Sequence, residues 1–156
     1  MDQETRNDLL KLFDSKLNQA MRLYLETCTR CGVCIEACHV YASTGQVKHI
    51  AAYRGEIIRR LYKKYFKGRG KFWPSVGEAK ELSEMALEEL YEAAYSCTGC
   101  RRCMVYCPFG IDTGVMFSYL RGLLFGQGFV PWEMKIGSGM HRIYRAQMDI
   151  TTEDWV

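Results

Sequence analysis

The spacing of apolar residues predicts helices along most of this chain. Over residues 4–26, apolar side chains recur every three or four positions, which is the period of one face of an α-helix. Residues 47–66, 82–96 and 113–125 keep the same period. The apolar positions of the four stretches are Leu9, Leu10, Phe13, Leu17, Ala20, Met21 and Tyr24; Ile50, Ile57, Ile58, Leu61 and Tyr65; Leu82, Met85, Ala86, Leu90, Ala93 and Ala94; and Val115, Met116, Tyr119, Leu120, Leu123 and Leu124. No stretch alternates apolar and polar residues between hairpin turns, so the fold is predicted to be all-α.

Helix-breaking residues divide the chain into a domain and a tail. Glycines and a proline after residue 67 end the second helix, and Asp112 is the expected N-cap of the fourth. Beyond residue 125 the helical period is lost among glycines. The chain is therefore predicted to form one domain over residues 1–125 and an irregular tail over residues 126–156.

Aromatic residues are scattered through this tail without a clear period. They are Phe129, Trp132, Tyr144 and Trp155. Such side chains either pack back onto their own domain or insert into a neighbouring subunit. We favour a contact with a neighbouring subunit.

Composition fits one compact domain and names no partner. The chain has 156 residues, 48% hydrophobic and 25% charged, with a net charge of +3. This charge is far below the surplus expected of a nucleic-acid-binding protein. No run of apolar residues is long enough to cross a membrane, and residues 1–4 are polar and acidic rather than the start of a secretory signal. We expect a cytoplasmic protein, with any membrane association made through partners.

Basic and aromatic residues are interleaved near the end of the second helix. They are Lys63, Lys64, Lys67, Arg69 and Lys71 with Tyr62, Tyr65, Phe66 and Phe72. This mixture occurs on nucleic-acid-binding surfaces, but more often it is the end of an amphipathic helix. We favour a docking face for an acidic partner, or a solvated face, and expect no nucleic acid.

The eight cysteines form two copies of one motif. Residues 28–38 and residues 97–107 each contain Cys-x2-Cys-x2-Cys-x3-Cys, and no cysteine lies outside them. Pro108 follows the second copy, as in the bacterial ferredoxin motif. This spacing is typical of [4Fe-4S] clusters, whereas a zinc ribbon would show two separate Cys-x2-Cys pairs. The sequence therefore predicts two [4Fe-4S] clusters, with zinc as the less favoured alternative and a disulfide framework less favoured still.

The ligand sets are expected to cross between the two motifs. In two-cluster ferredoxins, the last cysteine of each motif binds the cluster of the other motif. Applied here, this rule assigns one cluster to Cys28, Cys31, Cys34 and Cys107, and the other to Cys97, Cys100, Cys103 and Cys38. His39 is left out of the ligand sets because four cysteines complete each cluster.

Two such motifs separated by a long helical segment resemble the α-helical ferredoxin domain, and the resemblance covers about residues 20–125. In that domain, long helices flank and separate two cysteine loops, and each loop serves a [4Fe-4S] cluster. The loops Cys-Thr-Arg-Cys-Gly-Val-Cys-Ile-Glu-Ala-Cys-His-Val-Tyr and Cys-Thr-Gly-Cys-Arg-Arg-Cys-Met-Val-Tyr-Cys-Pro-Phe-Gly-Ile-Asp are most similar to those of the small iron-sulfur subunit of heterodisulfide reductase and its fused relatives. The resemblance implies an electron-transfer subunit of an oxidoreductase complex.

Residues absent from this sequence limit what it can do alone. It has no spare cysteine for a [2Fe-2S] domain, no Cys-Cys-Gly segment for heterodisulfide reduction and no nucleotide-binding glycine motif. The resemblance therefore implies two partners, a flavin- or iron-sulfur-containing donor subunit and a catalytic Cys-Cys-Gly-type subunit, and no catalytic residue here. The alternatives are an iron-sulfur redox sensor that binds nucleic acid, and a free dicluster ferredoxin.

Overall fold

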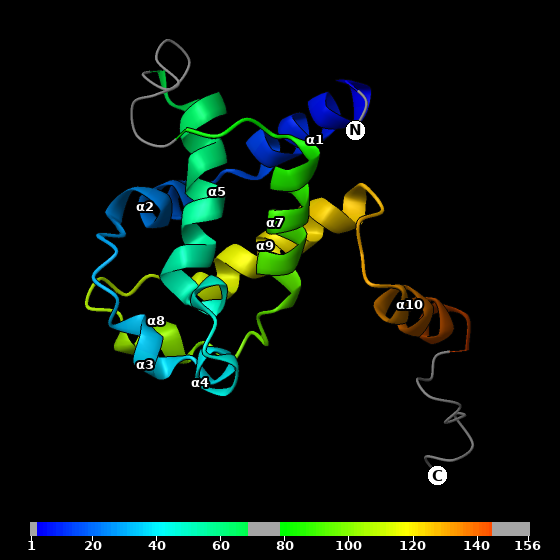
Figure 1. The fold of residues 1–156 in the computed structure, drawn as a ribbon. Helices are drawn as coiled ribbons and strands as arrows, with labels where there is room; N and C mark the ends of the chain where they lie inside the picture. Colours follow the sequence, from blue (N-terminus) through cyan, green and yellow to red (C-terminus); the bar gives the residue numbers. More distant parts are fainter. Residues whose placement is uncertain (1–2, 69–78, 145–156) are drawn as a thin grey trace.

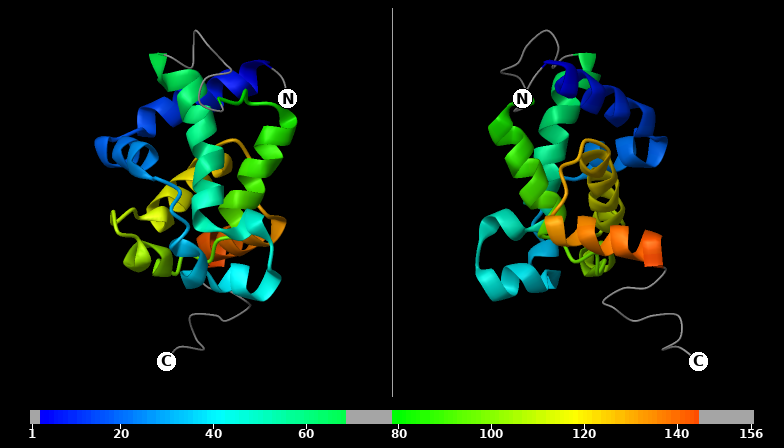
Figure 2. Two further views of the ribbon diagram at one scale, coloured as in Figure 1. Left: turned by 60° about the vertical axis from the view of Figure 1, so that its left-hand side comes forward. Right: turned by 90° about the vertical axis from the view of Figure 1, so that its right-hand side faces the viewer.

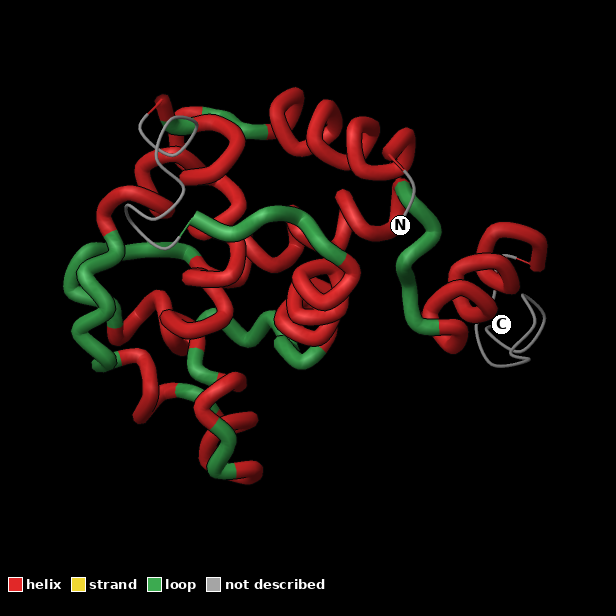
Figure 3. The backbone as a smooth tube through the Cα atoms, turned by 45° about the horizontal axis from the view of Figure 1, so that its top comes forward, coloured by secondary structure: helices red, strands yellow, loops and turns green. Residues whose placement is uncertain are grey.

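The computed structural model describes residues 3–68 and 79–144, and the described residues form helices and loops without a strand (Figure 1, Figure 3). The longer helices are α1 (Gln3–Lys16), α2 (Gln19–Thr27), α5 (Ala51–Phe66), α7 (Glu84–Tyr95), α9 (Thr113–Gly126) and α10 (Trp132–Tyr144). The short ones are α3 (Cys34–Ala37), α4 (His39–Thr44), the 3-10 helix η1 (Val47–His49) and α8 (Arg102–Tyr106). The prediction of an all-α fold is confirmed.

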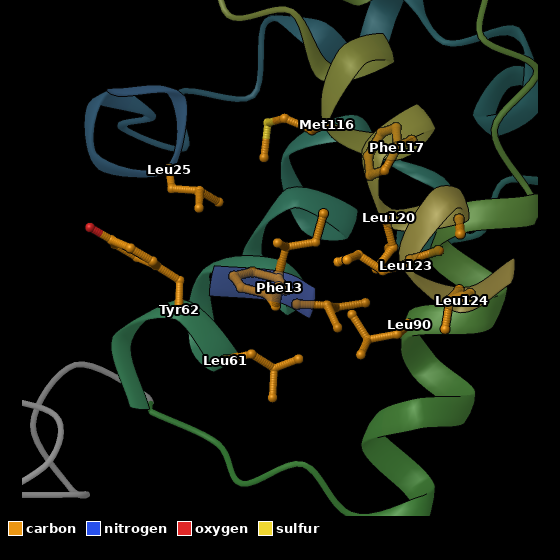
Figure 4. Close-up of a cluster of buried hydrophobic side chains, with 14 of the residues drawn as sticks. Phe13, Leu25, Leu61, Tyr62, Leu90, Met116, Phe117, Leu120, Leu123 and Leu124 are labelled. Carbon is orange, nitrogen blue, oxygen red and sulfur yellow. The ribbon is translucent and has the colours of Figure 1, made fainter. Parts of the chain in front are cut away.

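The core lies between α5, α7 and α9. Helices α5 and α7 pack side by side, α9 crosses behind them, α1 packs against α9, and α2 packs against α5 (Figure 1, Figure 2). Side chains from all five helices meet in the interior (Figure 4), among them Phe13, Leu25, Leu61, Leu90, Phe117 and Leu124. Each such side chain stabilises the fold by roughly 1.5–3 kcal/mol. Most of the predicted apolar positions are therefore buried, whereas Ala20, Met85 and Val115 are exposed.

The first predicted helix is two helices. Residues 4–26 were expected to form one helix, but the chain turns at Asn18, whose side-chain oxygen accepts a hydrogen bond from the amide of Met21 at 2.8 Å. An asparagine that caps a new helix offers the backbone an alternative to continuing the old one. Leu17 and Met21 are both buried, so the apolar period survives across the break and hides it.

Two further helix starts agree with local capping chemistry. Asp112 caps α9 as predicted, and its carboxylate accepts a hydrogen bond from the amide of Val115 at 3.0 Å. Ser83 caps α7 in the same way through the amide of Ala86. Helix α5, by contrast, begins after Ile50 without a side-chain cap.

The prediction of an irregular tail is wrong for residues 132–144, which form α10. Gly137 and Gly139 led to that prediction, but one glycine inside a helix costs only about 1 kcal/mol. Helix α10 lies outside the core and exposes Trp132, Ile136 and Ile143. Trp155, also assigned to the tail, lies outside the described residues.

The aromatic residues of the basic stretch pack inward where the structure describes them. Tyr62 is buried, and Phe66 stacks on Phe13 with ring centroids 5.2 Å apart. Lys64 and Lys67 pair with Glu81 and Glu26. This is the arrangement of an amphipathic helix end, while Arg69, Lys71 and Phe72 lie outside the described residues. None of the helices in the described ranges has the length and apolar character needed to span a bilayer.

Candidate iron-sulfur centre

Two helices deliver the two cysteine motifs to one end of the molecule. Helix α2 ends one residue before Cys28, and α7 ends two residues before Cys97. The short helices that follow, α3 and α8, pack against each other (Figure 1). The two motifs, far apart in sequence, therefore lie side by side.

The two loops share one backbone conformation. In each loop, the second and the fourth residue after the first cysteine have positive φ: Arg30 (59°) and Gly32 (83°) in the first, Gly99 (72°) and Arg101 (58°) in the second. Only glycine adopts this left-handed region without strain, so the two arginines carry a local cost. Two left-handed residues turn each backbone around a centre, as a loop wrapped around a cluster requires.

Each loop is anchored by an arginine from the helix that follows it. Arg59 of α5 donates from Nε to the Leu25 carbonyl at 2.6 Å and from Nη2 to the Cys28 carbonyl at 2.8 Å. Arg121 of α9 donates in the same way to the carbonyls of Ala94 and Cys97. These carbonyls lie at the C-terminal ends of α2 and α7, where a cation is favourable. Sequence reasoning missed both anchors, whose signal is an arginine within the apolar face of a helix.

The first anchor is neutralised by a buried carboxylate. Glu56 accepts from Arg59 Nη1 at 3.0 Å and pairs with Arg30 at 3.3 Å. The side chains of Arg59 and Glu56 are each only 8% exposed, so the pair is almost completely removed from water. A buried pair of this kind holds its geometry strictly because either partner alone would leave an uncompensated charge.

All four cysteines of the first expected set line one pocket. Cys28, Cys31, Cys34 and Cys107 line it together with Cys103, which belongs to the second expected set. The rest of the lining is mostly apolar and includes Ala52, Phe109 and Ile111. A largely apolar pocket bounded by thiols from both motifs is an environment that suits a cluster.

Two thiols of this pocket, those of Cys34 and Cys103, are partly buried. Burial raises the pKa of Cys34 and of Cys103, and a hydrogen bond from the amide of Ala52 to Cys34 opposes the shift there. Cys103 Sγ lies 2.6 Å from the Thr113 hydroxyl, at the start of α9. Each sulfur therefore contacts the first turn of a long helix, Cys34 that of α5 and Cys103 that of α9. Because a thiol that binds metal must lose its proton, bound iron would offset the cost of burying a thiolate here.

The end of the first motif contacts the loop that holds the other cysteines of the second expected set. Cys38 is buried between α3 and α4, and its sulfur lies 3.4 Å from the His49 carbonyl oxygen. The next residue, His39, reaches the second loop, with Nε2 3.2 Å from the Thr98 hydroxyl and Nδ1 3.7 Å from Cys100 Sγ. The end of the first motif therefore contacts the second loop through His39. His39 contacts this loop as a hydrogen-bonding neighbour of its sulfur.

The donor set fits a cube better than a single ion. Within residues 3–68 and 79–144, no three Cys, His, Asp or Glu side chains converge on one ion position. The thiols of the first set instead surround a pocket, and each iron corner of a [4Fe-4S] cube takes one thiolate. The residues present therefore fit the cluster that their spacing predicts.

A helical bundle that brings two such cysteine loops to one end defines an iron-sulfur protein of the all-α dicluster class. Residues 24–111 match the family described as the 4Fe-4S dicluster domain, and the chain belongs to this family. Two [4Fe-4S] clusters are therefore the cofactors of this domain. The resemblance inferred from the cysteine loops is confirmed.

Several curated proteins are similar over most of this chain. It is 44% identical over 107 residues to the Hdr-like menaquinol oxidoreductase iron-sulfur subunit 2 of Archaeoglobus fulgidus, covering 69% of this chain and 19% of that protein. It is 36% identical over 107 residues to the Hdr-like menaquinol oxidoreductase iron-sulfur subunit of Archaeoglobus profundus, with the same coverage. It is 35% identical over 123 residues to one subunit of the dihydromethanophenazine:CoB–CoM heterodisulfide reductase of Methanosarcina acetivorans, covering 76% of this chain and 29% of that protein. The chain thus spans less than a third of these relatives, and no solved structure matches it.

Proposed function

We propose that this chain relays electrons through two [4Fe-4S] clusters within a heterodisulfide-reductase-like redox complex. The pocket shared by the two motifs is the observation that carries the proposal, because it gathers Cys28, Cys31, Cys34 and Cys107 from two motifs that are far apart in sequence. The second cluster is held by Cys97, Cys100, Cys103 and Cys38. A [4Fe-4S] cluster supplies one-electron redox chemistry, at a potential set by charge, hydrogen bonds to sulfur and exposure.

The chain contributes the scaffold for this chemistry. The eight thiolates hold the clusters, and Arg59 and Arg121 fix the first cysteine of each loop through its carbonyl. Apolar residues such as Ala52 and Ile111 line the first pocket. A largely apolar site held between fixed helices limits the rearrangement that accompanies each electron, which favours transfer over bond-making chemistry. No residue of this chain is assigned a catalytic role.

The partners are proposed from the relatives. Their names describe subunits of a menaquinol oxidoreductase and of a heterodisulfide reductase. By analogy, a flavin- or iron-sulfur-containing subunit would donate electrons, and a Cys-Cys-Gly-type subunit or domain would accept them. The exposed apolar side chains of α10, Trp132, Ile136 and Ile143, support the proposal that residues 126–156 contact such a subunit.

Anaerobic purification tests the proposal. The protein should contain about eight irons and eight sulfides per chain and show two reducible [4Fe-4S] centres by electron paramagnetic resonance. A tagged chain, expressed in its native host, should copurify with a flavoprotein or with a Cys-Cys-Gly protein identified by mass spectrometry. About four irons or fewer per chain, or zinc instead of iron, would contradict the cluster assignment. A holo-protein that copurifies with neither class of partner would contradict the place in a complex.

A further inference from the structure

The two halves of the domain can be superposed in sequence register through their anchoring arginines. Arg59 lies eight residues after the first residue of α5, Ala51, and Arg121 lies eight residues after the first residue of α9, Thr113. Each arginine binds the first cysteine of the preceding loop and the residue three positions before it. Buried positions also correspond, since Leu61 and Leu123 both follow their arginine by two residues. Helices α5 and α9 therefore each anchor the preceding cysteine loop through an arginine at the same position.

One buried position breaks this correspondence. Five residues before its anchor, α5 carries Arg54, which is 2% exposed, whereas α9 carries Met116, which is 3% exposed. The guanidinium of Arg54 lies close to the last cysteine of the first motif, with Nη2 3.6 Å from Cys38 Sγ. Met116 is apolar, and its methyl group packs against Gly55. Only one of two matching sites thus receives a buried cation at this position.

The charge of Arg54 is not cancelled locally. Its other contacts are Ser96 Oγ, 3.4 Å from Nη1, and the ring of Phe117, whose centroid is 5.1 Å from the guanidinium carbon. Its Nε has no hydrogen-bond partner, and no carboxylate of the described residues pairs with it. Arg59 on the other site, by contrast, pairs with buried Glu56. A buried arginine without a counter-ion needs a negative group close by, and a cluster ligated by Cys38 would provide one.

We propose that Arg54 raises the reduction potential of the cluster held by Cys38 above that of the cluster held by Cys107. The proposal rests on the proposed function, since both clusters must be in place. A fixed buried cation favours the reduced state, which carries one more negative charge, and an N–H directed at a ligand sulfur acts in the same direction. One electron then passes from the first set's cluster to the second set's, oxidising one as it reduces the other. No proton moves, because the arginine stays charged throughout.

Arg54→Met tests this directly, because it gives the second site the residue that the first site has. The anaerobic holo-protein is titrated potentiometrically with dithionite, and both clusters are followed by electron paramagnetic resonance. We expect the equilibrium constant for reduction of the cluster held by Cys38 to fall at least tenfold, which is about 59 mV for a one-electron couple. The same constant for the other cluster should change less than threefold. Arg54→Lys, which keeps the charge, should retain most of the wild-type potential.

Two further variants separate charge from structure. Arg102→Met makes the same replacement at an exposed arginine of the second loop and should shift either cluster less than threefold, since water screens an exposed charge. Arg54→Gln keeps a hydrogen-bond donor without the charge, and it replaces Arg54→Met if that variant does not retain iron. Two clusters with unchanged potentials in the neutral Arg54 variants would overturn the inference but not the proposed function. A wild-type protein without two clusters would overturn both.

Discussion

The helix that follows the first cysteine loop and the helix that follows the second carry the same anchoring arginine at the same register, but differ in what surrounds it. In the first half, Arg59 is buried and paired with Glu56; in the second, Arg121 is partly exposed and lies over the ring of Tyr95. The shared anchor holds the loop, which both halves need. The unshared groups determine how much charge each half buries, and this is where two similar sites can acquire different properties.

Removing the last cysteine of one motif should abolish the cluster of the other motif, and this is the largest expected effect. Cys107→Ala should abolish the [4Fe-4S] cluster of Cys28, Cys31 and Cys34 and leave that of the second loop. Adding Cys31→Ala should then remove no further [4Fe-4S] cluster, whereas adding Cys100→Ala should remove the remaining one. Iron analysis and Mössbauer spectroscopy measure both. The reverse pattern in the double variants would show that each motif closes its own cluster.

Removing each anchor should cost the first half more than the second. Arg59→Met leaves the buried Glu56 without its closest cation, so we expect a loss of about 3–5 kcal/mol in the free energy of unfolding. Arg121→Met leaves two carbonyls without their donor and no carboxylate behind, so about 1–3 kcal/mol is expected. Guanidinium denaturation of the anaerobic holo-protein measures the difference. Arg142→Met on exposed α10 is the control, with an expected change within about 0.5 kcal/mol.

Removing the cap of α9 should make its start resemble that of α5, which has none. Asp112→Ala should cost about 1 kcal/mol because the Val115 amide loses its acceptor. Asp112 also lies 3.5 Å from Arg101, but that arginine is 61% exposed and should contribute little. Asp112→Asn, which keeps the acceptor and removes the charge, should therefore retain most of the stability. Equal losses in the two variants would assign the effect to the ion pair instead.

The smallest effect concerns Tyr119, which stands in α9 where α5 has Ile57. Its hydroxyl donates to the Phe13 carbonyl at 2.9 Å, and burial raises its pKa to about 12. At neutral pH, Tyr119→Phe should cost about 0.5 kcal/mol. The unfolded phenol loses its proton near pH 10, so the stability contributed by the neutral phenol is complete below pH 10 and is lost as the pH rises through about 12. At pH 11 most unfolded phenols but few folded ones have lost their proton, so the wild type loses about 1.4 kcal/mol, more than the substitution costs. Unfolding measurements should therefore find Tyr119→Phe less stable than the wild type at pH 8 and more stable at pH 11.

Much of the fold follows from local pattern. The apolar period located α5, α7 and α9 and their buried faces, and Asp112 was identified as a cap because its partner is three residues away. The break at Asn18 was missed because the buried positions continue in register on both sides of it. Helix α10 was missed because two glycines were taken as helix breakers. Local signals therefore predict elements well where no second local signal competes.

The chemistry of the centre divides in the same way. The cysteine spacing predicted the cofactor, because spacing within a loop is a local property. The roles of Arg54, Arg59 and Arg121 could not be predicted, since their partners are sulfur and carbonyl groups on other helices. In sequence they are only arginines among apolar residues. Their function depends on which helices pack together.

The shared pocket also bears on how the protein is made. Its lining comes mainly from residues 28–34 and from residues 103–113. The first loop therefore emerges from the ribosome long before the second part of the lining has been synthesised. Until then its thiols face solvent, open to oxidation and to the wrong metal. Cluster insertion must therefore wait until both parts of the lining have been synthesised. Until then, the nascent chain needs a reducing environment or a chaperone that covers its thiols.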